Sequence, residues 1–177
     1  MTSPDVDAAV DVRLLGPLEV RLAGRPVSLG GPRPRALLTV LALSAGTTVP
    51  GHRLVELIWE GEPPATASNV VQVYVSRLRR ALTRSPGRPE SPSRPESPGR
   101  PVLRSGSGGY LLDLPAEAVD ALRFERLAAQ GHLLLAAADP AAAAEVLGRA
   151  LALWRGDAVP DLAGLPTGDA VLARLDG

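Results

Sequence analysis

Side chains of the kind that read DNA bases fall within the segment TASNVVQVYVSRLRRAL, residues 66–82. If this segment is a helix, Asn69, Val73, Ser76 and Arg80 point away from its apolar stripe, and Gln72 and Arg77 lie on the flanks of that face. Arginine can pair with guanine, asparagine or glutamine with adenine, and an outward valine can meet a thymine methyl group. The alternative is an ordinary solvated helix face, which is the better interpretation for an isolated arginine-rich helix.

The same segment could form a strand or a helix. Its centre, VQVYVS, alternates apolar and polar residues and contains several valines, which favours a strand locally. The apolar pattern continues over the whole segment, however, and places Val71, Val75, Leu78 and Leu82 on one helical stripe. The length of this pattern favours a helix.

Two shorter helices are expected just before it. In PRPRALLTVLALSAG, residues 32–46, prolines stand in the first turn and leucines follow at helical spacing. In HRLVELIWEG, residues 52–61, Leu54, Leu57 and Ile58 share one face. Three helices in a row with the most basic one last form a helix-turn-helix layout, which favours the DNA interpretation over the solvated face.

Strands are expected on both sides of these helices. In residues 12–31 short β-rich runs alternate apolar and polar residues, which predicts an antiparallel meander. Farther along, Val102–Arg104 and Tyr110–Leu114 predict a hairpin with a slightly long Gly/Ser loop. A hairpin after a recognition helix is a wing, and Arg104 at its base could reach a phosphate or the minor groove. Its glycines match no phosphate-binding motif.

A proline-rich repeat, RPESPSRPESPGRP, occupies residues 88–101 between the third helix and the hairpin. Proline removes backbone donors, and serine and glutamate add no apolar area, so nothing offsets the entropy of ordering this stretch. Because the recognition helix and the wing must belong to one folded unit, residues 84–101 are expected to be a disordered insertion rather than a linker between domains. A long loop costs little stability.

Leucine- and alanine-rich helices are expected after residue 116. AVDALRFERLAAQGHLLLAAA, residues 118–138, predicts one helix, and Asp139-Pro140 starts a second that runs to Trp154. The positions expected to be buried in the first of these helices include Leu122, Leu127, Leu133 and Leu134. A further amphipathic helix is expected to begin at LARLDG, residues 172–177. One tetratricopeptide-like hairpin falls short of the three repeats that usually make a stable stack. It is therefore expected to dock on the first unit or on a partner.

Composition narrows the class of protein. Of the 177 residues 45% are hydrophobic and none is cysteine, which excludes disulfides, thiolate catalysis and cysteine-based metal sites. No signal peptide or membrane-spanning stretch is seen, so a soluble cytoplasmic protein is expected. Residues 1–104 hold 14 arginines and 9 acidic residues, whereas residues 105–177 hold 5 and 10. The basic front part suggests a polyanionic partner.

An enzyme is the rival class that the sequence supports least. His52 and His132 are far apart in the sequence, and the acidic residues show no metal-ligand spacing, so neither a cofactor nor a metal is expected. A protein-interaction module, in which the winged helix and the helical hairpin dock a partner without DNA, remains the other alternative.

Four stretches of the chain resemble the antibiotic regulatory proteins of actinomycetes. They are VRLLGPLEVRLAGRPVSLGGPRPRALLTVLAL, HRLVELIWEGEPPATASNVVQVYVSRLRRAL, GGYLLDL and AAADPAAAAEVLGRALALWRG. The resemblance implies an α+β fold: an OmpR-type winged helix-turn-helix with an N-terminal antiparallel sheet over residues 12–115, then a truncated, α-helical, tetratricopeptide-like activator domain over residues 116–177. Residues 1–11 are expected to be a disordered tail.

The same resemblance implies a transcription regulator, expected to activate a secondary-metabolite gene cluster. Its implied partners are double-stranded DNA carrying direct repeats near the promoter, RNA polymerase holoenzyme and a second copy on DNA. With no receiver domain ahead of the winged helix, no phosphorylated aspartate is expected. The positions that match DNA-contacting ones are Asn69, Val70, Gln72, Val73, Tyr74, Ser76 and Arg77, with Arg80 nearby. Gly106 departs from the arginine often found at that wing position.

Overall fold

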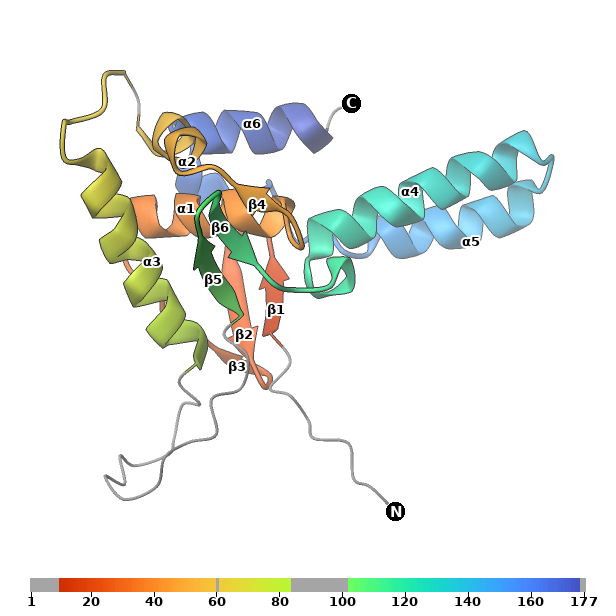
Figure 1. Ribbon diagram of the computed structural model, residues 1–177. Coiled ribbons are helices and arrows are strands. Elements are labelled where there is room, and N and C mark those ends of the chain that lie inside the picture. The colour runs from red at the N-terminus through yellow and green to blue at the C-terminus, as the bar shows by residue number, and fades with distance from the viewer. Residues whose placement is uncertain (1–9, 60, 84–101, 176–177) are drawn as a thin grey trace, which may run out of the picture.

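The computed structural model describes residues 10–59, 61–83 and 102–175. The expected disorder of the insertion, residues 84–101, and of residues 1–9 lies outside this part of the chain. Two antiparallel three-stranded sheets, three consecutive helices and a C-terminal helical segment make up the fold (Figure 1). Within the described residues, none of the helices is both long and apolar enough to cross a membrane.

The first sheet is the expected meander, because alternate residues of its strands are apolar and face the core. Its strands, in the order β1-β2-β3, are Val10–Arg13, Glu19–Leu22 and Arg25–Pro26. Val10 pairs with Leu22 and Val12 with Val20, and all four side chains are buried. The expectation that the N-terminal tail extends to residue 11 is therefore wrong, since burial of Val10 draws residues 10 and 11 into the strand.

The three consecutive helices form where the sequence predicts them. They are α1 (Pro32–Leu43), α2 (Gly51–Ile58) and α3 (Ala67–Thr83). The choice of a helix over a strand for the third is confirmed, and its buried residues are Ala67, Val71, Val75, Leu78 and Leu82. Burial of the complete stripe against α1 and α2 outweighs the local strand preference of its valines.

The second sheet contains the expected hairpin and one strand that sequence reasoning missed. Its order is β4-β6-β5, with bounds Thr48–Val49, Gly109–Leu112 and Leu103–Gly106. The hairpin strands extend as far as the Gly106–Gly109 pair, so the loop has two residues, Ser107 and Gly108, and is shorter than expected. Gly109 has a φ of +137°, and an added Cβ would lie 2.1 Å from the carbonyl oxygen of Val49 on β4.

The C-terminal segment has a projecting part and a docked part. Its elements are η1 (Ala116–Ala118), α4 (Asp120–Ala136), α5 (Pro140–Leu151), η2 (Pro160–Leu162) and α6 (Pro166–Leu175). The antiparallel helices α4 and α5 extend away from the rest of the molecule, whereas α6 lies beside α2 and α1 (Figure 1). Asp139 caps α5 by accepting a hydrogen bond from the amide of Ala142, as expected for an N-cap.

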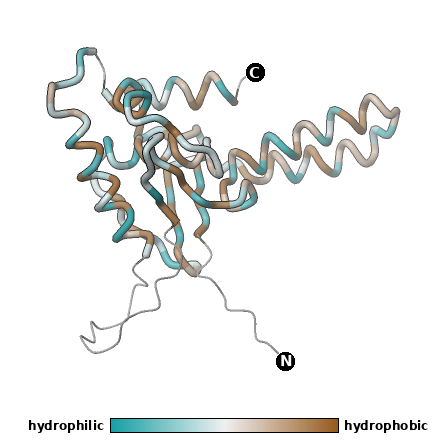
Figure 2. Tube along the Cα trace, viewed as in Figure 1, coloured by the Kyte–Doolittle hydropathy of each residue, from teal (hydrophilic) through white to brown (hydrophobic). Residues whose placement is uncertain are grey.

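Two details of the helical hairpin differ from the sequence-based expectation. Helix α5 ends at Leu151, and Trp154 lies beyond it with its ring edge-on to Phe124 at a centroid distance of 5.5 Å. Of the four leucines expected to be buried in α4, Leu133 is 72% exposed, and Leu122, Leu127 and Leu134 are half-buried. Leu133 lies in the last turn of α4, and hydrophobic residues recur along both helices of the hairpin (Figure 2). Periodicity showed which residues share a face but not whether that face has a neighbour.

One hydrophobic core continues from the first sheet into the C-terminal segment. Val159, Leu162 and Val171 are fully or almost fully buried in the same cluster as the side chains of β1, β2 and α1. The C-terminal segment also provides hydrogen-bond acceptors for backbone amides in the turn between β1 and β2. Asp120, at 2% exposed, accepts hydrogen bonds from the amides of Leu14 and Leu15. The expected docking of the helical segment onto the first unit therefore occurs, through residues 153–175 and the start of α4.

Candidate nucleic-acid interface

The outward face of α3 carries the residues that the sequence predicts there. Five of the predicted residues are exposed to solvent: Asn69, Gln72, Val73, Arg77 and Arg80. Val73 is 48% exposed, and the other exposed large apolar side chains of the described residues all lie on α4, α5 and α6. Because the opposite stripe of α3 is buried, its rotation about its own axis is fixed, and these five residues are presented together on one face.

The remaining predicted positions on α3 lie at the borders of this face. Val70, Tyr74 and Ser76 are half-buried, and Val70 and Tyr74 pack against the core. Tyr74 and Arg77 also line a shallow cleft of about 210 Å³ together with residues 31–34 at the start of α1. These border residues therefore have less freedom to move than the five exposed ones.

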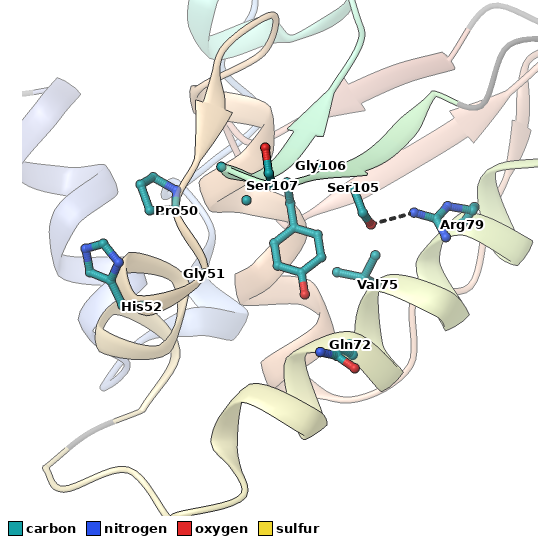
Figure 3. Close-up of a pocket in the computed structure, with 12 residues that line it drawn as sticks. Pro50, Gly51, His52, Gln72, Val75, Arg79, Ser105, Gly106 and Ser107 are labelled. Carbon is teal, nitrogen blue, oxygen red and sulfur yellow. Dashed lines mark hydrogen bonds between the residues drawn. The ribbon is translucent and has the colours of Figure 1, made fainter.

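Arg79 joins α3 to the wing, a role that sequence reasoning missed. Its Nε donates a hydrogen bond to the carbonyl oxygen of Leu103 at 2.9 Å, and its Nη2 donates to Oγ of Ser105 at 2.9 Å (Figure 3). Both acceptors belong to β5, so one guanidinium fixes the hairpin against the recognition helix. The signal available in the sequence was the position of Arg79 four residues after the buried Val75, at the flank of the apolar stripe.

An open cleft of about 740 Å³ separates α3 from the wing (Figure 3). Its walls come from the start of α2, from the inner flank of α3 and from the tip of the hairpin. The residues that line it are Pro50, Gly51, His52, Gln72, Val75, Arg79 and residues 105–110. Gln72 and Arg79 point into it from α3, which makes the cleft a polar continuation of the exposed face of that helix.

Arg104 does not join the other predicted contact residues. Its Nη2 donates a hydrogen bond of 2.6 Å to Asp113, so its charge is already paired within the hairpin. Neighbouring residues of a strand point to opposite faces, so Arg104 lies on the face of β5 opposite Ser105, which contacts Arg79. The sequence-based prediction placed Arg104 near the wing but did not consider which face of β5 its side chain occupies.

A metal centre built from clustered side chains is not found in the described part of the chain. Nowhere among its residues do three or more histidine or acidic side chains gather in a way that could hold a metal ion. His52 and His132 are both exposed, and they lie on different elements, α2 and α4.

Comparison with known proteins agrees with this geometry. Residues 24–91 match the family described as the C-terminal domain of transcriptional regulatory proteins, and residues 119–176 match the bacterial transcriptional activator domain. The regulatory protein DnrI of Streptomyces peucetius is 37% identical over 168 residues. The transcriptional regulator RedD of Streptomyces coelicolor is 36% identical over 152 residues. The chain belongs to the antibiotic regulatory protein family of actinomycetes.

Members of this family can be longer than the chain described here. The match covers 94% of this chain and 60% of DnrI, and 86% of this chain and 41% of RedD. A solved structure, Mycobacterium tuberculosis EmbR in complex with a low-affinity phosphopeptide, superposes with a TM-score of 0.78 at 30% sequence identity. It covers 95% of this chain and 42% of EmbR. The winged helix and the helical segment that follows it are thus found together in a solved relative.

Proposed function

We propose that this chain is a sequence-specific DNA-binding transcription regulator that activates a secondary-metabolite gene cluster. The observation that carries the proposal is the exposed face of α3, where an asparagine, a glutamine, a valine and two arginines are held in fixed register by a buried stripe. These are the side-chain types that read base edges in the major groove. The family relationship supports the same function.

In the proposed complex α3 lies in the major groove. Arg77 and Arg80 pair with guanines or phosphates, Asn69 and Gln72 with adenines, and Val73 contacts a thymine methyl group. The half-buried residues at the border of the face, Val70, Tyr74 and Ser76, contact the sugar-phosphate backbone. The tip of the wing approaches the adjacent minor groove. Because Arg104 is paired with Asp113 through Nη2, we assign it mainly to support of the hairpin.

We assign the DNA-binding function to residues 12–115 and an activating function to residues 116–177. The proposed partners are a DNA site with direct repeats, a second copy of the chain on that site, and RNA polymerase holoenzyme. A tandem arrangement fits direct repeats because each copy would present α3 in the same orientation. No cofactor is part of the proposal.

Selection of bound duplexes from a random DNA pool tests this function. We expect the chain to enrich one short motif, found twice in the same orientation, and to bind it more tightly than a scrambled duplex of equal length and composition. Affinity measured at several salt concentrations should fall linearly on a log–log plot. If no motif is enriched, or if the scrambled duplex binds equally well, sequence-specific DNA binding is excluded and a protein-docking role becomes the better interpretation.

A further inference from the structure

Helix α6 supplies hydrogen-bond donors to the ends of two helices that are distant from it in sequence. The hydroxyl of Thr167 donates to the carbonyl oxygen of Leu57, in the last turn of α2. Nη1 of Arg174 donates a hydrogen bond of 2.9 Å to the carbonyl oxygen of Leu43, which is the last residue of α1. Carbonyl groups in the last turn of a helix have no partner within that helix, so both bonds satisfy otherwise unpaired acceptors.

The charge of Arg174 complements the end of α1. Neither α1 nor α2 carries a basic residue in its last turn, where a cation would interact favourably with the helix dipole. Arg174 provides that charge from α6. Its Nε and Nη2 also donate to the two carboxylate oxygens of Glu125 on α4, at 2.5 and 2.9 Å. One side chain therefore connects the projecting α4–α5 hairpin with the first helix of the helix-turn-helix.

The position of α6 is itself closely fixed. Thr167 is 1% exposed, and Val171 is fully buried in the main core. A Cβ added to Gly168 would lie 2.4 Å from the carbonyl oxygen of Leu162, so the start of α6 sits directly on η2. Within η2, Asp161 accepts a hydrogen bond from Arg35 of α1. A displacement of α6 would therefore be transmitted to α1 and α2.

We propose that Thr167 and Arg174 are positioning residues for DNA recognition, which fix α1 and α2 and through them the orientation of α3. This inference rests on the function proposed above. None of these side chains lies on the exposed face of α3, so their effect on DNA is indirect.

The experiment compares Thr167→Val, which keeps the shape but loses the donor, with Thr167→Ser, which keeps the donor. Arg174→Gln is compared with Arg149→Gln, since Arg149 is an exposed arginine on the projecting hairpin. Each full-length variant is studied by backbone hydrogen exchange without DNA, and by titration with the duplex selected from the random pool. The titration is repeated at several salt concentrations.

We expect Thr167→Val and Arg174→Gln to lower affinity for the selected duplex roughly 2- to 30-fold. The salt slope should not change, because no phosphate contact is removed. Backbone amide hydrogen exchange should become faster in the last turn of α2 in Thr167→Val and in the last turn of α1 in Arg174→Gln. The amides of β1 and β2 should keep their protection from exchange in both variants. Thr167→Ser and Arg149→Gln should behave like the unmodified chain.

Unchanged affinity in both variants, or exchange that rises equally throughout the molecule, would overturn the positioning role. If the unmodified chain selects no duplex, the proposed function fails. The exchange measurement then still decides whether α6 holds the ends of α1 and α2, because it is made without DNA. If the last turn of α2 is equally protected from exchange in Thr167→Val and in the unmodified chain, the Thr167–Leu57 contact does not hold that turn. This conclusion does not depend on whether the chain binds DNA.

Discussion

The buried carboxylate of Asp120 accepts a hydrogen bond of 2.6 Å from the backbone amide of Leu14, 106 residues earlier in the chain. Its second oxygen accepts from the amide of Leu15 at 3.1 Å. One side chain at the start of α4 thereby satisfies two amides in the turn between β1 and β2. Burial raises the pKa of Asp120 above its ordinary value, although the hydrogen bonds from Leu14 and Leu15 oppose that shift.

Replacing Asp120 with asparagine should destabilise the fold by about 1–3 kcal/mol, because an amide has one acceptor oxygen and one of the two buried amides loses its partner. The difference should depend on pH. A carboxyl group with a raised pKa in the folded state stabilises most below its unfolded pKa, and this contribution disappears as pH rises through the folded pKa. The stability advantage of the unmodified protein over Asp120→Asn should therefore be largest below the unfolded pKa of about 3.9 and shrink as the pH rises. Thermal melts of both proteins across this range test it. A difference that grows with pH would contradict the raised pKa.

Arg77→Ala and Arg80→Ala should each weaken binding to the selected duplex. Loss of a base contact should cost about 1–3 kcal/mol and relax preference at one base, whereas loss of a phosphate contact should lower the salt slope by about 1. Arg149→Ala removes the same charge on the projecting hairpin and serves as the control. If the double variant folds normally and binds with unchanged affinity and salt slope, α3 does not face DNA.

Arg79→Gln should loosen the wing rather than remove a DNA contact. It deletes the donors to Leu103 and Ser105, and we expect a loss of about 1–2 kcal/mol in the free energy of unfolding. Affinity for the selected duplex should fall while the salt slope stays the same, in contrast to Arg80→Ala. Arg79→Lys should not restore the wild-type behaviour, because an ammonium group lacks the planar fork of the guanidinium. A reduced salt slope in Arg79→Gln would instead indicate a direct phosphate contact.

Gly109→Ala should destabilise the second sheet by at least about 2 kcal/mol. Its φ of +137° is unfavourable for alanine, and the new Cβ would collide with the carbonyl oxygen of Val49. Gly108→Ala is the matched control, since an added Cβ there would meet only a side-chain methyl group of Thr48 at 3.7 Å. Thermal melts of the two variants test the prediction, and equal melting temperatures would contradict the close approach of β6 to β4.

The elements with a complete amphipathic pattern could be predicted from the sequence. The buried stripe of α3 and the alternation of buried and half-buried residues in β2 both follow from local spacing. The two-residue strand β4 could not be predicted, because it exists only through its pairing with β6, about sixty residues later. Most of the outward face of α3 could likewise be predicted, although Ser76, expected on that face, is half-buried.

The parts of the candidate site that depend on long-range contacts could not be predicted in the same way. Arg79 and Arg80 are adjacent in the sequence, yet Arg79 is held by β5 while Arg80 is exposed. Arg104 is predicted to bind DNA from its position in the sequence, but it is paired with Asp113, nine residues away on the other side of the hairpin. An arginine next to an apolar stripe has the same local pattern whether it supports the fold or binds a ligand.

The last prediction concerns residues 116–177 expressed as a separate fragment. In the whole chain Val159, Leu162 and Val171 are buried against the first sheet and α1. In the fragment these side chains would face water, and Asp120 would lose both amides that it binds. The α4–α5 hairpin keeps its own contacts, with Leu147 lying over Gly131, but one helical pair buries too little area for a stable fold.

We therefore expect this fragment to melt without a cooperative transition or to self-associate, and circular dichroism melts with sedimentation measurements test this. Mixing it with residues 1–115 should restore a cooperative transition if the contacts at Leu14 and Leu15 re-form between the two pieces. Asp120→Asn in the fragment is the matched control, and it should weaken that recovery. A cooperatively melting monomer made from residues 116–177 alone would show that the hairpin is an independent domain and that its contacts with β1 and β2 are dispensable.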